Sequence, residues 1–364
     1  MPQRSGALAR AWRLLREPVP AHKRRLLADR RQALDPRWRT PLQGLGQQAT
    51  GCGATLGVSP RCDFDCHGCY LGAGANRVAP LPLGEVFAQL DRLRRWLGPK
   101  GNVQITDGEV TLLPEAELIA VVRRAREIGL LPMVMTHGDS FRRRPGLLAR
   151  LVAEGGLREV AIHVDSTQRG RRGFRRAASE EELTPLREEF AAMLRQVRRD
   201  TGVRLRAAST LTVARANLDG AGAVAAWCFA NRDAFGLVSF QPLAQVGRTR
   251  PGMAGVGADE LWRTIGGALA PYGFDGARRS PFAFGHPACS RIEPSLVYQR
   301  HGEPPRLLAL VRPGRSGDEA LVAEFFRRGH GGLSFRDDPR LERVARLLGA
   351  LAADPGWFAG PVRR

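Results

Sequence analysis

The sequence predicts an α/β fold in which six parallel strands alternate with helices and curve into part of a barrel. Strand-like segments rich in Val, Ile, Leu and Thr recur between residues 54 and 242, and segments with helical apolar spacing separate them. Such alternation is typical of parallel strands joined by right-handed crossovers. Several strand-like segments also end in polar residues, as expected where the carboxyl ends of barrel strands carry the chemistry. We therefore predict a partial (β/α)6 TIM-like barrel.

The predicted elements follow one another along the chain with clear start and stop signals. The helix at 114–128, for example, has Pro114 in its first turn and Gly129 after its end. An open, doubly wound sheet is the alternative, but no G-x-G-x-x-G turn follows the first strand. Strands are expected at 54–58, 101–106, 131–136, 159–165, 203–213 and 237–242. Helices between them are expected at 83–97, 114–128, 147–153, 180–199 and 219–231.

The barrel is expected to carry an extension at each end. Residues 1–50 form a basic N-terminal extension, in which Leu8, Trp12 and Leu15 share one helical face. This helix is expected either to pack on the domain or to lie on a membrane surface. Residues 51–245 form the barrel, and residues 246–364 form an irregular C-terminal extension that covers it and shapes the substrate site. Within this extension we expect a linker or mobile loop at 247–257, helices at 259–270 and 341–353, and strands within 294–311.

The charge and the cysteine content restrict the setting of the protein. The formal net charge is +20, but the basic residues are nearly all Arg, with Lys only at positions 23 and 100. Part of the charge therefore reflects a GC-rich coding bias, although a field of this size still attracts anionic partners. No secretory leader and no apolar run of about 18 residues is evident. We expect a reducing, cytoplasmic location, with a peripheral contact at the inner membrane surface if the N-terminal helix binds there.

Three of the six Cys lie in one short loop after the first strand, as Cys62, Cys66 and Cys69 at the spacing C-x3-C-x2-C. Iron–sulfur cubanes are ordinarily held by four thiolates, so three suggest a cluster with one iron open to a non-protein ligand. Zinc is an alternative, although structural zinc prefers four closed ligands and no second Cys pair follows. The remaining alternative is a set of buried, inert thiols.

The Cys loop and the sequence Thr106-Asp107-Gly108-Glu109 at the end of the second strand together resemble the radical S-adenosylmethionine (radical SAM) superfamily over roughly residues 50–245. The resemblance implies that Cys62, Cys66 and Cys69 hold a [4Fe–4S] cluster whose open iron binds S-adenosylmethionine. It also implies that Glu109 accepts the methionine amino group and that reductive cleavage gives a 5′-deoxyadenosyl radical, which abstracts hydrogen from a substrate.

The same resemblance suggests further contacts with the cofactor. Gly108 permits close backbone approach. The sequence departs from the family pattern in having Gly68 before the third Cys, where an aromatic residue is common, and Asp107 where Gly is usual. Asp165 and Ser166 either bind the cofactor ribose or cap the next helix, and His163 either lines the cavity or is a core residue. The candidate cofactor-binding residues are Tyr70, Asp107, Gly108, Glu109, His163, Asp165, Ser166 and Gln241, the last beside the adenine.

Two other Cys bear on the subfamily. Cys289 lies in an irregular segment and is a candidate catalytic residue, as a hydrogen-atom donor or transient covalent site, or else a simple loop thiol. Cys228, in an apolar helix, is expected in the core. The C-terminal third lacks a Cys-rich segment for auxiliary clusters, and no cobalamin-binding domain is evident before the barrel.

The substrate is suggested only by a looser resemblance. Val103 to Leu113, His163 to Thr167 and Phe240 to Arg248 are similar to the branch containing tetraether lipid synthases and archaeal pterin-type methylases. This implies a small-molecule or lipid-like substrate, C–C bond formation or C-methylation, and a reducing partner such as flavodoxin or ferredoxin. An RNA-modifying radical enzyme is an alternative, because five Arg lie within 169–176, but no RNA-binding module is recognisable. A non-catalytic zinc-binding protein is the other alternative.

Overall fold

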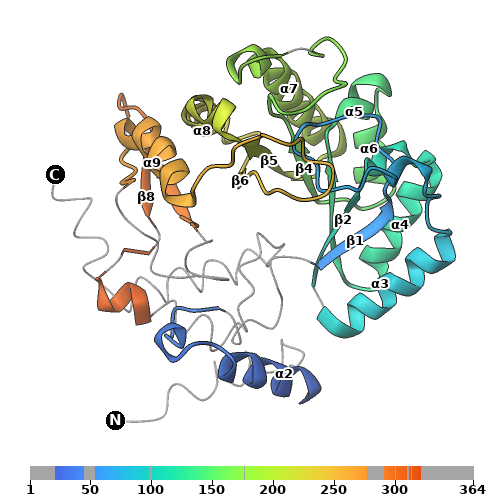
Figure 1. The fold of residues 1–364 in the computed structure, drawn as a ribbon, viewed down its shortest axis with the longest axis horizontal. Helices are drawn as coiled ribbons and strands as arrows, with labels where there is room; N and C mark the ends of the chain where they lie inside the picture. Colours follow the sequence, from blue (N-terminus) through green and yellow to red (C-terminus); the bar gives the residue numbers. More distant parts are fainter. Residues whose placement is uncertain are drawn as a thin grey trace.

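Six parallel strands form one sheet in the computed structural model, in the order β1-β2-β3-β4-β5-β6. Each strand therefore pairs with the next along the chain, and β1 and β6 lie at opposite edges. The sheet curves, and helices follow one another along its outer side (Figure 1). This confirms the predicted α/β, partial TIM-like barrel. The structure describes residues 21–44, 54–97, 101–175, 177–276, 291–299, 301–309, 311–312 and 314–320.

One face of the sheet is apolar and buried against the helices. Leu56 of β1 lies beside Ile105 of β2, which lies beside Val134 of β3 and then Val160 of β4. Each of these side chains is at most 1% exposed. Because alternate residues of a strand point to opposite faces, the residues between them point into the concave side of the sheet. The strands are β1 Ala54–Ser59, β2 Asn102–Asp107, β3 Leu131–Thr136, β4 Glu159–His163, β5 Arg206–Val213 and β6 Leu237–Pro242.

The helices cover this apolar face with amphipathic sequences. In α3, Val86 and Leu90 are buried at helical spacing, and in α4, Leu118 and Val122 are buried in the same core cluster as the strands. Full burial of such a side chain stabilises the fold by about 1.5–3 kcal/mol. The helices are α3 Leu83–Leu97, α4 Glu115–Glu127, α5 Asp139–Arg143, α6 Leu147–Ala153, α7 Thr184–Thr201 and α8 Leu218–Ala230.

Further elements lie outside the sheet. Helix α9 (Ala258–Leu269) packs on α8 in a second core cluster. Strands β7 (Ser295–Tyr298) and β8 (Arg306–Ala309) form an antiparallel pair, and α2 (Ala21–Gln32) precedes the barrel. Among the described residues, no helix combines the length and the apolar composition needed to cross a bilayer. The helices predicted around Leu8–Leu15 and at 341–353 lie outside the described residues, and the domain boundaries at 50 and 245 stay predictions.

Two of the differences from the sequence-based expectation lie at the carboxyl edge of the sheet. Strand β4 ends at His163 rather than at Asp165, because the Asp165 carboxylate accepts a hydrogen bond from Thr167 N–H (2.8 Å) and turns the chain. The short helix α5 was not predicted; it begins after Gly138, whose φ of +81° suits a residue without a side chain.

Candidate functional site

The loop that carries the three Cys follows β1 at the carboxyl edge of the sheet. Cys62, Cys66 and Cys69 are all partly buried in it. The loop is fixed by backbone bonds to the segment after β4, from Asp65 N–H to Arg169 O (2.9 Å) and from His67 N–H to Thr167 O (3.0 Å). The thiols are therefore held on a defined backbone where parallel α/β barrels collect their chemistry.

The thiols are in an environment that disfavours free thiolates. Burial raises the pKa of Cys62 to about 12 and that of Cys66 to about 12, and the charge of Asp165 adds to the effect on Cys66. Thiolate ligands in such a place require a cation, and a bound metal deprotonates its thiols outright. The Cys loop is therefore inert as a set of free thiols.

One group of potential metal ligands lies at the spacing of a single bound ion. Within the described residues, the ligand atoms of Cys62, Asp63 and His137 all lie within 4.8 Å of one another, and the three Cys do not form such a group. The choice between a cluster and zinc therefore rests on the C-x3-C-x2-C motif rather than on the distances between the thiols.

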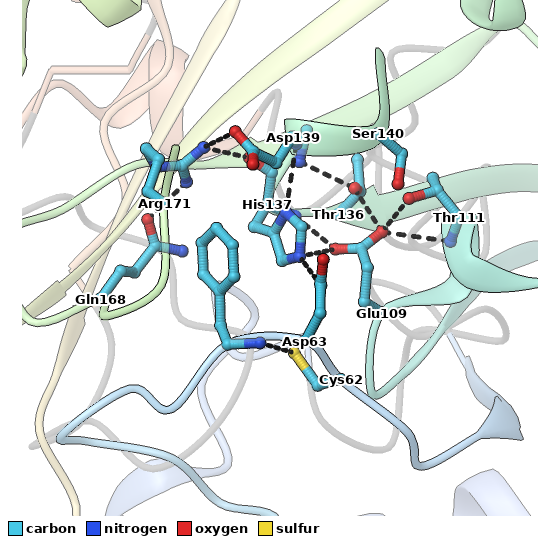
Figure 2. A network of polar contacts seen from close by, with 12 residues as sticks. Cys62, Asp63, Glu109, Thr111, Thr136, His137, Asp139, Ser140, Gln168 and Arg171 are labelled. Carbon is cyan, nitrogen blue, oxygen red and sulfur yellow. Dashed lines mark hydrogen bonds and ion pairs between the residues drawn. The ribbon is translucent and has the colours of Figure 1, made fainter. Parts of the chain in front are cut away.

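A polar network ties the Cys loop to the end of β3 (Figure 2). His137 accepts a hydrogen bond at Nδ1 from Asp139 N–H (3.1 Å), so its Nε2 carries the proton and donates to Asp63 Oδ1 (2.9 Å). The imidazole also stacks on Phe64, with centroids 3.7 Å apart. Burial raises the pKa of Asp63, but the hydrogen bond from His137 and the charge and hydrogen bond of Arg143 lower that pKa to about 2. The segment between the first two Cys is thus anchored at two consecutive residues.

Glu109 lies at the centre of the same network and is only 1% exposed. Its Oε1 accepts hydrogen bonds from Thr111 N–H (3.1 Å), Thr111 O–H (2.5 Å) and Thr136 O–H (2.6 Å). Its Oε2 accepts one from His137 N–H (2.8 Å) and lies 3.2 Å from His137 Nε2. These contacts use the accepting capacity of the carboxylate. An ammonium group can bind Glu109 only by replacing one of them, and the contact with His137 Nε2 is the longest.

The conformation of the residues before Glu109 is fixed by their contacts with the backbone that leads into the Cys loop. Gly108 N–H donates to Ser59 O (2.8 Å) and Glu109 N–H to Arg61 O (2.7 Å). A Cβ on Gly108 would lie 2.1 Å from Arg61 O, so only Gly fits. Asp107 has a φ of +116°, which costs a non-Gly residue of order 1–3 kcal/mol and explains why Gly is the common residue there.

We expect Gly108→Ala to lower the free energy of unfolding by about 1–3 kcal/mol, because Pro60 and Arg61 must move to admit the methyl group. Gly84→Ala is the matched control, since a Cβ at Gly84 meets nothing within 4 Å and Ala is favoured in a helix. Anaerobic denaturant unfolding followed by circular dichroism measures both variants. Equal stability of Gly108→Ala and the wild type would contradict the close approach.

The departure before the third Cys has a steric explanation. A Cβ on Gly68 would lie 2.3 Å from Leu243 Cδ1, so an aromatic side chain there would displace the Leu243 side chain. Tyr70 instead supplies an aromatic ring on the other side of Cys69. It is 59% exposed, and its hydroxyl donates to Asp107 O. Tyr70 and Asp107 are therefore brought together at the loop.

Of the candidate residues at the ends of β4 and β6, two have buried side chains that are already hydrogen-bonded, and two have side chains that are accessible to solvent. Asp165 is buried, accepts from Thr212 N–H (2.9 Å) and lies 2.6 Å from His163 Nε2. Burial raises its pKa, but the charge and hydrogen bond of His163 and other hydrogen bonds lower it to about 2. Ser166 donates through N–H and O–H to Glu180 (both 2.9 Å) rather than capping α7. The His163 side chain is 31% exposed and Gln241 is exposed, so these two remain accessible.

Some residues that organise the site carry no sequence signal. Arg171 lies in the Arg-rich segment but is only 1% exposed; it donates to His137 O (2.8 Å) and His163 O (2.9 Å) and lies over the Phe64 ring. The RNA-modifying alternative relies on five Arg within 169–176, and because Arg171 is buried it cannot contribute to an RNA-binding surface. Glu180 is likewise buried and paired with Arg187. In sequence, neither residue differs from its solvent-exposed neighbours of the same charge.

The remaining Cys are placed only in part. Cys228 is buried in α8, and burial raises its pKa to about 11, in keeping with a core thiol. Cys289 lies outside the described residues, so its proposed catalytic role stays a prediction.

Residues 56–194, which include the Cys loop, Glu109 and Asp165, match the family model of the radical SAM superfamily. No curated protein matches the chain. Among solved structures, native anSMEcpe with bound AdoMet is similar with a TM-score of 0.42 and 11% identity, over 60% of this chain and 60% of its own. TsrM from Kitasatospora setae, a radical S-adenosylmethionine methyltransferase with cobalamin and a [4Fe–4S] cluster bound, is similar with a TM-score of 0.38 and 15% identity, over 59% of this chain and 44% of its own. The chain thus spans less than two thirds of the length of these structures. Residues 56–194 thus match the radical SAM superfamily, and this match supports an enzyme of that class.

Proposed function

We propose that this enzyme cleaves S-adenosylmethionine reductively at a [4Fe–4S] cluster held by Cys62, Cys66 and Cys69. As in the superfamily, its cofactors are a [4Fe–4S] cluster and S-adenosylmethionine, and it requires a reductant. The observation that carries the assignment of ligands is the single loop with three partly buried thiols at the carboxyl edge of the sheet. When bound, the cluster supplies one electron to the sulfonium, and the C5′–S bond breaks to give methionine and a 5′-deoxyadenosyl radical.

The chain's own residues would hold the cofactor from several sides. Glu109 would accept the methionine amino group by exchanging its 3.2 Å contact with His137 Nε2 for an ammonium hydrogen bond. Asp107 and Gly108 would supply backbone close to the cofactor, with Tyr70 beside them. Glu109 would thus have two roles: it would bind the methionine amino group, and its remaining hydrogen bonds would hold it to the end of β3.

The adenosine part would lie nearer β4 and β6. His163 and Gln241 have accessible side chains and are the candidates for direct contact. Asp165 would act through His163, since its Oδ2 lies 2.6 Å from the His163 ring. Ser166 is engaged by Glu180, so any contact with the ribose would need that pair to open.

The proposed substrate is apolar or lipid-like, and the proposed outcome is C–C bond formation or C-methylation. Two exposed apolar side chains beside the Cys loop support an apolar substrate. They are Tyr70, which is 59% exposed, and Val246, which is 51% exposed. Val246 precedes Gly247, whose Cα lies against the Tyr70 backbone, so the two residues are close in space. A flavodoxin- or ferredoxin-type protein is the proposed electron donor.

The test is anaerobic reconstitution with iron and sulfide. We expect the absorbance of a [4Fe–4S] cluster, the paramagnetic resonance of its reduced state, and formation of 5′-deoxyadenosine when dithionite and S-adenosylmethionine are added. Incubation with cell extract, followed by untargeted mass spectrometry against Cys66→Ala, identifies products. One zinc per chain without iron or sulfide in anaerobically purified protein would favour the zinc-binding alternative and overturn the proposal.

A further inference from the structure

The segment after β6, residues 243–250, lies directly on the Cys loop. Arg248 N–H donates to both Cys69 O (2.9 Å) and Leu71 O (2.9 Å), and Arg250 N–H donates to His67 O (2.9 Å). The sequence predicts a linker or mobile loop from residue 247 onward, and this expectation is wrong for its first residues, because backbone bonds fix them to the loop.

Gly247 makes this contact possible. Its φ is +59°, and a Cβ there would lie 2.2 Å from both C and O of Tyr70. The backbone of residue 247 thus touches the backbone that follows Cys69, and the next side chain, Arg248, enters the site at a fixed position.

The Arg248 guanidinium reaches Phe64, the third residue of the Cys loop. One terminal nitrogen donates to Phe64 O (2.8 Å). Its Nε is buried and, within the described residues, has no hydrogen-bond partner. An Arg side chain keeps its charge at every working pH. A permanent positive charge therefore lies on the Cys loop next to Cys69, whose carbonyl accepts from Arg248 N–H, with a buried N–H unused.

We propose that Arg248 raises the reduction potential of the cluster by placing its positive charge and its buried Nε–H at the sulfur atoms around Cys69. The inference rests on the proposed function, because it requires the cluster. Hydrogen bonds to the sulfurs and nearby charge are among the factors that set cluster potentials. One electron from a low-potential donor adds one negative charge to the cluster, and a neighbouring cation stabilises that reduced state.

Arginine suits this task better than lysine would. Its charge is retained at every working pH, and its planar group has several N–H donors in fixed directions, so one can bind Phe64 O while another faces a sulfur. A lysine would keep the charge but not both directed contacts.

The experiment is a potentiometric measurement of the cluster by paramagnetic resonance, with dithionite as reductant and without S-adenosylmethionine. The variants are R248Q, R248K and R250Q. For R248Q we expect a more negative midpoint potential, with the ratio of reduced to oxidised cluster at the wild-type midpoint falling tenfold, which corresponds to 59 mV for one electron. R248K is expected to shift less. R250Q is the matched control, because Arg250 is in the same segment but its side chain is 55% exposed and lies 3.6 Å from Asp65.

The variant G247A separates an effect of Arg248 on the reduction potential from a purely structural role, since it disturbs the segment 243–250 without removing the Arg248 charge. A merely structural Arg248 predicts that R248Q, like G247A, lowers the cluster content while the clusters that remain keep the wild-type potential. That result, or an equal shift in R250Q, overturns the inference. If R248Q retains no cluster, the midpoint potential of the cluster in R248K is compared with the wild-type potential instead. Wild-type protein without a [4Fe–4S] signal would instead overturn the proposed function, so the two failures are distinguishable.

Discussion

Cys66→Ala is expected to abolish cluster retention and to reduce 5′-deoxyadenosine formation to the level of a reaction without enzyme. Cys66 is the middle ligand of the proposed three, and a cubane with only two protein ligands would expose two irons to solvent. Iron and sulfide per chain, the absorbance spectrum and product formation measure the effect after anaerobic reconstitution.

The matched control is Cys228→Ala, which removes a buried thiol that lies in α8 rather than in the Cys loop. It should leave iron, sulfide and product formation at the wild-type level, apart from a modest loss of stability from the lost sulfur atom. Wild-type iron and sulfide in Cys66→Ala, or equal losses in the two variants, would contradict the assignment of the loop as the ligand set.

Glu180→Ala is expected to destabilise the fold by about 3–5 kcal/mol, because it leaves Arg187 buried without its counter-charge. The two side chains are 1% and 2% exposed and form an ion pair, and Glu180 Oε1 also accepts from Ser166 and from Asn217 Nδ2 (2.8 Å). The variant therefore removes a shared acceptor at the carboxyl edge of the sheet. Anaerobic denaturant unfolding measures the loss.

Glu188→Ala is the control for this variant, since Glu188 is an exposed residue of α7. Its effect should stay within about 0.5 kcal/mol. Replacing the pair together, as Glu180→Ala with Arg187→Met, should recover part of the loss, because no buried charge is then left unpaired. A Glu180→Ala protein as stable as Glu188→Ala would show that the ion pair is not buried in solution.

Local pattern was sufficient to predict most of the fold. Helices α3 and α6 and strands β3 and β6 have the predicted bounds, because each is a periodic apolar segment with turn residues on both sides. Strand β5 begins at Arg206, three residues after its predicted start at 203.

The candidate site was less predictable, because its contacts join residues distant in sequence. The Cys spacing and the Asp107-Gly108-Glu109 sequence are local patterns, so these residues could be named. Glu109 has two partners at the end of β3, Thr136 and the next residue, His137, and both follow only from the pairing of β2 with β3. The segment at 243–250 has the Gly, Arg and Thr content of a solvent-exposed linker, and only its contact with the Cys loop reveals its place.

The backbone bonds between residues 243–250 and the Cys loop also have a mechanical consequence. In the described sheet, β1 and β6 are opposite edges, and the loop after β1 meets the segment after β6 through Arg248 and Arg250. These hydrogen bonds therefore connect the segments that follow the first and last strands, which do not pair with each other. A metal centre held by Cys62, Cys66 and Cys69 would lie beside these bonds. Its loss should loosen both edges of the sheet and speed amide hydrogen exchange in β1 and β6 together.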